Sequence, residues 1–275
     1  MYDRFIHQWL NIPHTLYSRV ISADKPIATV LFIHGIGNSG AVWDKVLRKL
    51  PTDIRIVTID LLGFGGSSRP SWAIYSAKTQ ARSVLKTFFN LRLGGPVIVV
   101  GHSLGALVAV EMAKRSPRLV QSLILCSPPF YQPNLGEKRL FPRSDGVLKI
   151  IFKKIHQHPE RFLQITSVAM RYKLINEPFD ATKAGVDSYM GTLEAAIINQ
   201  TSLEDVKKLQ LPIHMIRGTF DPMVVSRNLK GLASDHPNVT VVQIAATHEV
   251  KGFFVAAVVK AIERACKVNR VATDS

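Results

Sequence analysis

The sequence predicts an α/β protein in which a mostly parallel central sheet is flanked by helices. Short apolar runs rich in β-forming residues alternate with longer segments whose apolar residues recur at helical spacing. Strands that alternate with helices indicate βαβ crossovers, which place parallel strands in one sheet with helices on its faces. The length of 275 residues suits one large domain, or one domain with an inserted subdomain.

Six apolar runs are expected to form the strands. Residues 96–100 are apolar throughout, as in a strand buried on both faces, whereas residues 54–60 alternate apolar and polar side chains. Glycine or proline follows closely after most runs and marks the expected strand ends. The expected strands are 28–33, 54–60, 96–100, 119–126, 213–217 and 239–244.

Helices are expected between these strands and at the C-terminal end of the sequence. Their apolar residues recur three and four positions apart, which is the spacing of one helical face. The expected helices of this part are 41–50, 76–91, 104–115 and 253–268.

A long segment, residues 131–208, interrupts the alternation of strands and helices. We interpret it as a helical cap, or lid, inserted into a core formed by residues 1–130 and 209–275. Its own apolar spacing is mostly helical. The helices expected within it are 146–156, 160–174, 181–198 and 202–208.

Composition narrows the classes of partner. With 47% hydrophobic and 20% charged residues, the chain can bury a sizeable core. The net charge of +15 is compatible with binding to nucleic acid or an anionic membrane, but the basic residues are scattered and form no nucleic-acid motif. We therefore expect a basic solvated surface and no nucleic-acid partner, and an anionic membrane surface stays open as a partner.

The sequence carries no pattern for a metal, a disulfide framework or an export signal. Cys126 and Cys266 have no metal-ligand spacing, and the histidines form no H-E-x-x-H pattern. Residues 1–10 lack the apolar core and the cleavage site of a signal peptide, and no run reaches the ~18 apolar residues of a membrane helix. We expect no cofactor, a cytoplasmic location, and a monomer or homodimer.

Residues 101–105, Gly-His-Ser-Leu-Gly, form a G-x-S-x-G motif between an expected strand and an expected helix. A serine at the sharp turn between a buried strand and a helix is typical of a nucleophile held in a strained backbone. Its neighbours two positions away must be small, and Gly101 and Gly105 remove side chains that would clash with the helix or the preceding strand. The helix N-terminus favours negative charge that develops at the turn. We predict that Ser103 is a catalytic nucleophile.

With this motif the sequence resembles the α/β-hydrolase superfamily, and specifically its lipase- and esterase-like members with a helical lid. The resemblance covers about residues 15–268. It implies the α/β-hydrolase fold and an oxyanion hole made of the backbone N–H groups of Ile36 and Leu104. Ile36 follows the His34-Gly35 pair after the first expected strand, and Leu104 directly follows the expected nucleophile.

The same resemblance assigns the acid and the base, in the chain order serine, acid, histidine. Asp221 lies in a G-x-x-D position directly after an expected strand, and His248 follows the last expected strand. Thr247 stands before His248, where the family commonly has glycine, and this departure is expected to change the backbone angles of the loop. Asp60 precedes Ser103 in the chain, so we interpret it as a residue that orders its own glycine-rich loop rather than as the acid.

Several other side chains receive structural interpretations. His34 is expected to make structural hydrogen bonds, His102 to stand behind the site, and His214 to be a hydrogen-bonded interior residue of its strand. The lid is expected to line an apolar pocket, although the same aromatic and methionine residues fit the core of the lid equally well. The candidates are Phe130, Tyr131, Met170, Tyr172, Tyr189 and Met190.

Together these residues predict a serine hydrolase that cleaves carboxylic esters by two-step acyl transfer through Ser103, His248 and Asp221. The expected substrate is a small-molecule ester with an apolar acyl group, and no cofactor or metal is needed. Thioesterase, lactonase, aminopeptidase and C–C bond hydrolase activities use the same arrangement and stay open. Two further alternatives are a ligand-binding receptor without turnover and a peripheral lipase that acts on anionic lipid.

Overall fold

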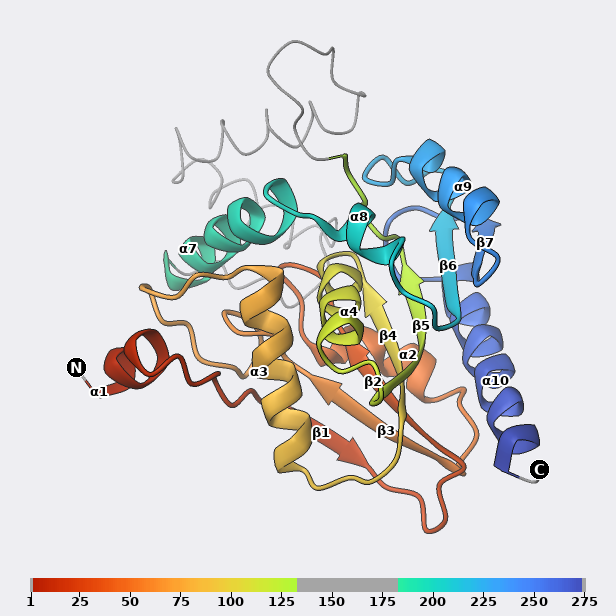
Figure 1. Cartoon of the computed structure of the whole chain (residues 1–275), viewed down its shortest axis with the longest axis horizontal. Helices are drawn as coiled ribbons and strands as arrows, with labels where there is room; N and C mark the ends of the chain where they lie inside the picture. The colour runs from red at the N-terminus through yellow and green to blue at the C-terminus, as the bar shows by residue number, and fades with distance from the viewer. Residues whose placement is uncertain (1, 133–182, 274–275) are drawn as a thin grey trace.

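The sheet is the central element of the fold. The computed structural model describes residues 2–132 and 183–273 (Figure 1). The strands in this part of the chain are β1 (Ser18–Ile21), β2 (Ala28–Ile33), β3 (Ile54–Ile59), β4 (Val97–His102), β5 (Val120–Cys126), β6 (Ile213–Gly218) and β7 (Val239–Ile244). They form one sheet in the order β1-β3-β2-β4-β5-β6-β7, in which β2 to β7 are parallel and β1 pairs antiparallel with β3. The predicted α/β fold with a mostly parallel sheet is confirmed.

All six runs expected as strands form β2 to β7, and their ends differ from expectation by at most two residues. These strands were recognisable because most are buried on both faces: every residue of β4 is buried. Strand β1 was not expected. It has four residues that alternate between half-buried and exposed, so its apolar pattern is too short to distinguish it from a loop.

Helices cover both faces of the sheet (Figure 1). Alternate residues of β2 show the two layers: Leu31 and Ile33 join one hydrophobic cluster, whereas Val30 and Phe32 join the other. The first cluster receives α3 (Ala77–Asn90), α4 (Leu104–Arg115) and α9 (Ser226–Asp235). The second receives α2 (Asp44–Leu47) and α10 (Phe253–Thr273). The site described below therefore rests on a sheet that is fixed from both sides.

Three of the four expected core helices are confirmed as α3, α4 and α10. The expectation of one helix over 41–50 was wrong, because a 3-10 helix (Gly40–Trp43) precedes a short α2. The apolar spacing that suggested it still marks the buried residues Trp43, Val46 and Leu47. Helix α9 was not expected, since Leu229 and Leu232 are its only buried residues and give a weak pattern. Two short elements precede β1, α1 (Tyr2–Arg4) and a π-helical turn (Phe5–Trp9).

Of the expected cap, the structure describes residues 131–132 and 183–208. The helices expected at 146–156 and 160–174 lie outside the described residues. The helix expected at 181–198 is observed as α7 (Lys183–Thr192) continued by a π-helical segment (Leu193–Ile198), and α8 (Ser202–Val206) follows. Leu193, Ala196 and Ile197 belong to the same hydrophobic cluster as α4. The division into core and cap stays a prediction.

Among the described helices, none is both long enough and apolar enough to cross a membrane.

Candidate active site

Ser103 lies in the turn between β4 and α4, at the carboxyl edge of the sheet. Its backbone has φ 52° and ψ −114°, a conformation that non-glycine residues rarely adopt. Two hydrogen bonds hold it there: Ser103 N–H donates to the Cys126 carbonyl at 2.9 Å, and Ala106 N–H donates to the Ser103 carbonyl at 2.9 Å. The neighbouring strand and the helix thus hold a conformation that would otherwise relax.

Glycines surround this turn because backbone or side-chain atoms of neighbouring residues occupy the space where their own side chains would be. A Cβ atom on Gly101 would lie 2.5 Å from the carbonyl carbon of Gly105, and one on Gly105 would lie 2.7 Å from the His34 carbonyl oxygen. A Cβ atom on Gly35 would lie 3.2 Å from Ser103 Cβ. The predicted close approach to the helix is confirmed for Gly101, whereas Gly105 approaches the end of β2, the neighbouring strand, rather than the strand that precedes the motif.

The two backbone donors expected from the sequence lie at the same edge of the sheet. Leu104 is the first residue of α4, and Ile36 follows β2, the strand next to β4. Among the described residues, neither Ile36 N–H nor Leu104 N–H donates to a protein acceptor. Free N–H groups at a helix N-terminus and in the adjoining loop are suited to binding an oxygen that carries negative charge.

Asp221 and His248 come together from the loops after β6 and β7. His248 Nδ1 lies 2.9 Å from Asp221 Oδ2 and 3.0 Å from Oδ1, so Nδ1 carries the proton and Nε2 is left as an acceptor. The Asp221 side chain is fully buried, whereas the His248 side chain is 24% exposed. A Cβ atom on Gly218, at the end of β6, would lie 2.6 Å from the Thr247 carbonyl oxygen. Glycine at this position therefore lets the two loops approach each other.

The Asp221 carboxylate is stabilised in its charged form. Burial raises the pKa of Asp221, but the hydrogen bond and charge of His248 and the N–H of Met223 outweigh burial. The pKa of Asp221 therefore falls below its ordinary value. Met223 N–H donates to Asp221 Oδ1 at 2.9 Å and fixes the carboxylate in its loop. The pair is thus an ionised acid that orients a neighbouring imidazole.

His102 links the turn at Ser103 to the loop of His248. Its Nε2 lies 2.8 Å from the His248 carbonyl oxygen, and the two imidazole rings are 5.0 Å apart. Burial and the nearby charge of His248 lower the pKa of His102 to about 3, so its ring is neutral and Nε2–H is the donor. His102 Nδ1 is buried without a hydrogen-bond partner among the described residues. The sequence indicated that His102 stands behind the site, but it gave no sign of this contact.

Ser103 makes no hydrogen bond to His248 within the described part of the chain. The two residues are connected instead through the adjacent His102, whose ring packs beside that of His248. In structures without substrate, hydrogen bonds between a nucleophile and its base are often long and tighten only when substrate binds. The structure therefore brings Asp221 and His248 into contact and places Ser103 at the same edge.

His34 and Asp60 have structural hydrogen bonds, as expected. His34 Nε2 accepts from Leu61 N–H at 2.9 Å, and its Nδ1 lies 2.7 Å from the Gly35 carbonyl. Asp60 accepts from Gly40 N–H at 2.6 Å and from Gly66 N–H at 2.8 Å. Burial lowers the pKa of His34, which keeps its ring neutral. Both side chains thus hold the loops that surround the turn.

Thr247 does not need the conformation of a glycine. It is absent from the residues with positive φ, which among the described non-glycine residues are Asn11, Arg92, Ser103 and Ser127. The φ angle of Thr247 therefore gives no support to the expectation that threonine changes the backbone angles of the loop. Thr247 is also exposed.

The expected pocket-lining residues are only partly described. Phe130 and Tyr131 are buried, and the Tyr131 hydroxyl donates to the Met223 carbonyl at 2.8 Å, beside Asp221. Tyr189 and Met190 are half-buried in α7. Met170 and Tyr172 lie outside the described residues. No group of three or more potential metal-ligating side chains occurs within residues 2–132 and 183–273.

Comparison with known proteins gives the family. A sequence model of the alpha/beta hydrolase fold matches residues 28–250. A probable lysophospholipase of Arabidopsis thaliana, BODYGUARD 5, is 27% identical over 261 residues, which cover 82% of this chain but only 58% of that protein. Lipase LipV of Mycobacterium tuberculosis is 39% identical over 101 residues, or 37% of each chain. The chain thus spans little more than half the length of the first of these relatives.

A solved structure extends the similarity over the fold. The esterase EaEST of Exiguobacterium antarcticum matches with a TM-score of 0.74 at 14% identity, over 92% of this chain and 95% of the esterase. At this identity the match shows a shared fold and carries no statement about substrate.

Proposed function

The chain belongs to the alpha/beta hydrolase fold family, and we propose that it is a hydrolase that cleaves carboxylic esters by two-step acyl transfer. One observation carries this proposal above the others. A serine held at φ 52° after a buried strand shares a sheet edge with a histidine that is hydrogen-bonded to a buried carboxylate. Nucleophile, base and orienting acid are the three parts that this chemistry needs.

In the first step, Ser103 Oγ attacks the ester carbonyl while His248 Nε2 takes the hydroxyl proton. The imidazolium formed on His248 is stabilised by the ionised Asp221, which also keeps the proton on Nδ1. His248 then gives its proton to the leaving alcohol, and Ser103 is left as an acyl ester. In the second step, His248 takes a proton from water, which attacks the acyl carbonyl, and Ser103 is released with its proton returned.

The developing oxyanion would be held by the N–H groups of Ile36 and Leu104. Both donors lack a protein acceptor among the described residues, so binding an oxyanion would break no existing hydrogen bond. Because backbone donors are fixed before the reaction, they cost no reorganisation in the transition state. Loss of one such donor typically raises the barrier by about 3 kcal/mol.

The decisive experiment combines labelling and turnover. Wild type should react with a fluorophosphonate probe and hydrolyse p-nitrophenyl esters, and Ser103→Ala should do neither while it keeps the wild-type melting temperature. Ser22→Ala, at an exposed serine after β1, is the matched control and should retain both activities. Wild type that is folded but neither labelled nor active would refute the proposal. Labelling with a burst and no turnover would instead identify a ligand-binding receptor.

Substrate class is tested by a panel of acyl donors. Two relatives carry the words lysophospholipase and lipase in their names, so glycerolipid esters come first in the panel. Thioesters, lactones, aminoacyl amides and C–C substrates share the acyl-enzyme logic and form its remaining arms. The ester proposal requires kcat/KM to be highest for an oxygen ester.

A further inference from the structure

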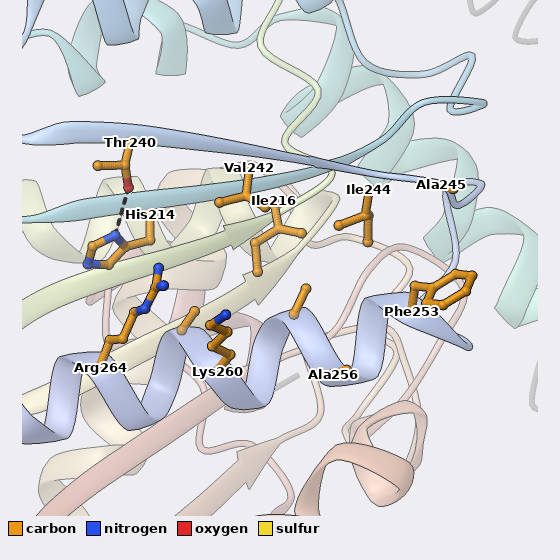
Figure 2. Close-up of a pocket in the computed structure, with 12 residues that line it drawn as sticks. His214, Ile216, Thr240, Val242, Ile244, Ala245, Phe253, Ala256, Lys260 and Arg264 are labelled. Atoms are coloured by element: carbon orange, nitrogen blue, oxygen red, sulfur yellow. Dashed lines mark hydrogen bonds between the residues drawn. The ribbon is translucent and has the colours of Figure 1, made fainter.

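A groove lies outside the candidate active site, between the last strand of the sheet and the C-terminal helix. Figure 2 shows side chains of β6 and β7 above it and side chains of α10 below it. Its volume is about 620 Å³, within the range of about 300–1,000 Å³ typical of small-molecule sites. The groove exists because β7 is an edge strand whose outer residues are left partly uncovered.

The walls of this groove are mainly apolar and reachable from solvent. Phe253 is 71% exposed and Val242 is 43% exposed, and Ile216 and Ile244 form the wall between them. Contiguous apolar surface that is exposed to solvent often marks a binding site. Ala257 on α10 leaves room opposite these side chains.

Positive charge is confined to the half of the groove away from Phe253. Lys260 and Arg264 extend from α10 toward the strands, and Arg264 points toward His214, while Phe253 and Ala245 lie at the other end (Figure 2). No lining residue is acidic, and among the described residues neither cation has a salt-bridge partner.

His214 shows that the charge reaches into the groove. Its Nδ1 lies 2.7 Å from Thr240 Oγ1, and burial together with the positive charge of Arg264 lowers the pKa of His214. His214 is thus hydrogen-bonded, as expected, but it lines a groove rather than the interior. Because the ring stays neutral at pH 7, Lys260 and Arg264 supply the cationic charge.

We propose that this groove binds an amphiphile with one apolar chain and an anionic head group, specifically a medium-chain carboxylate. Lys260 and Arg264 bind the carboxylate, and the chain lies along the apolar wall toward Phe253. From Phe253 to Arg264, α10 runs for about 16 Å at 1.5 Å per residue, which sets the length of ligand that the groove accommodates.

A second copy of the chain fits this groove poorly. A twofold interface brings the same patch of both partners together, so two copies of Lys260 and Arg264 would lie in one interface with no acidic lining residue to offset their charge. Twelve residues line the groove, whereas a standard protein interface involves about 20–30 residues of each partner. A small anionic amphiphile meets both constraints.

Binding in this groove does not depend on ester hydrolysis. The groove ends at Ala245, in the loop that leads to His248, but it contains none of the residues proposed to react. Its test is therefore direct binding, made with Ser103→Ala so that turnover plays no part. The result of this binding test can therefore be interpreted even if the protein does not hydrolyse esters.

The experiment is calorimetric titration of the full chain with decanoate below its micellar concentration. One decanoate should bind per chain, octanoate should bind more weakly by roughly two- to fourfold for each CH₂ removed, and decyltrimethylammonium should not bind. The double variant Lys260→Gln/Arg264→Gln should weaken decanoate binding by about tenfold or more. Lys45→Gln/Lys230→Gln, which removes the same charge from exposed positions elsewhere, should bind as Ser103→Ala does.

A steric variant separates this groove from the candidate active site. Ala257→Phe should abolish binding by filling the apolar half, and Ala256→Phe, at a more exposed lining position, repeats the test if Ala257→Phe melts early. Because Ser103→Ala has no turnover, the effect of these substitutions on catalysis is measured in wild type. Both substitutions should leave ester hydrolysis unchanged there, because the groove contains none of the residues proposed to react. If the affinity for decanoate is unchanged in all groove variants, the ligand binds elsewhere and the proposal is overturned. Equal binding of the cationic amphiphile, or a dimer that groove substitutions dissociate, also overturns it.

Discussion

Gly105→Ala tests how the turn at Ser103 is held. The added Cβ atom would lie 2.7 Å from the His34 carbonyl oxygen and closer still to that of Ile33, whereas carbon contacts are optimal near about 3.5 Å. Both obstacles are backbone of β2 and its continuation, so α4 must move by about 1 Å to make room. That movement carries the Leu104 N–H and the Ser103 backbone with it.

Two magnitudes follow from this displacement. Overpacking of a tightly packed position costs about 1–3 kcal/mol in the free energy of unfolding. A shift of about 1 Å in reacting groups costs about 100-fold in rate, so kcat/KM for p-nitrophenyl acetate should fall by about that factor. Gly105→Ala should therefore lose both stability and activity.

The assay is urea denaturation together with initial rates, and its control is Gly231→Ala. A Cβ atom at Gly231, inside α9, meets nothing within 4 Å, so this variant should gain about 0.5–1 kcal/mol and keep wild-type activity. Wild-type stability and activity in Gly105→Ala, with the expected gain in Gly231→Ala, would show that the turn is not held by close packing on β2.

Three further predictions concern neighbouring residues. The pKa of His102 is lowered to about 3 in the folded protein, so the unfolded chain binds more protons below pH 6.5 and stability falls as the pH drops from about 6.5 toward 3. In urea titrations, His102→Gln should remove about 1.4 kcal/mol per pH unit of this slope. An unchanged slope would contradict a neutral buried ring. Asp60→Asn should lose about 1–3 kcal/mol because Gly40 and Gly66 N–H donate to its carboxylate, whereas exposed Asp24→Asn should be neutral in the same thermal melts. Thr247→Gly should lower the free energy of unfolding by about 0.5–1 kcal/mol, because glycine gives the unfolded chain more conformational entropy. Ester turnover should stay within about threefold of wild type, since Thr247 has no positive φ. A large gain in turnover would mean that threonine strains the loop.

Much of the fold follows from hydrophobic patterning. Parallel strands buried on both faces leave continuous apolar runs, so β2 to β7 could be located closely. Patterning fails where burial is slight, as in β1 and in α9, which buries only Leu229 and Leu232. It also overstated the helix at 41–50, because a 3-10 turn can bury the same side chains as an α-helix.

The site was accessible from sequence only through its local motifs and chain order. The motif around Ser103 indicates a turn because small residues are needed there, and chain order pointed to Asp221 and His248, which the structure brings into hydrogen-bond contact. Their roles stay predictions. The bond from His102 to the His248 carbonyl could not be foreseen, because a side chain that binds a distant backbone carbonyl leaves no pattern at the acceptor residue.

The strand order also governs when the candidate site forms during folding. Ile36 follows β2 and His248 follows β7, and residues 127–212 separate β5 from β6, where Leu123 pairs with Ile213. Bringing together two strands so far apart in the sequence costs chain entropy before any strand contact compensates, so their pairing is slow. In refolding, helical signal should therefore return first, and competence for labelling at Ser103 should return last, when β6 and β7 join the sheet.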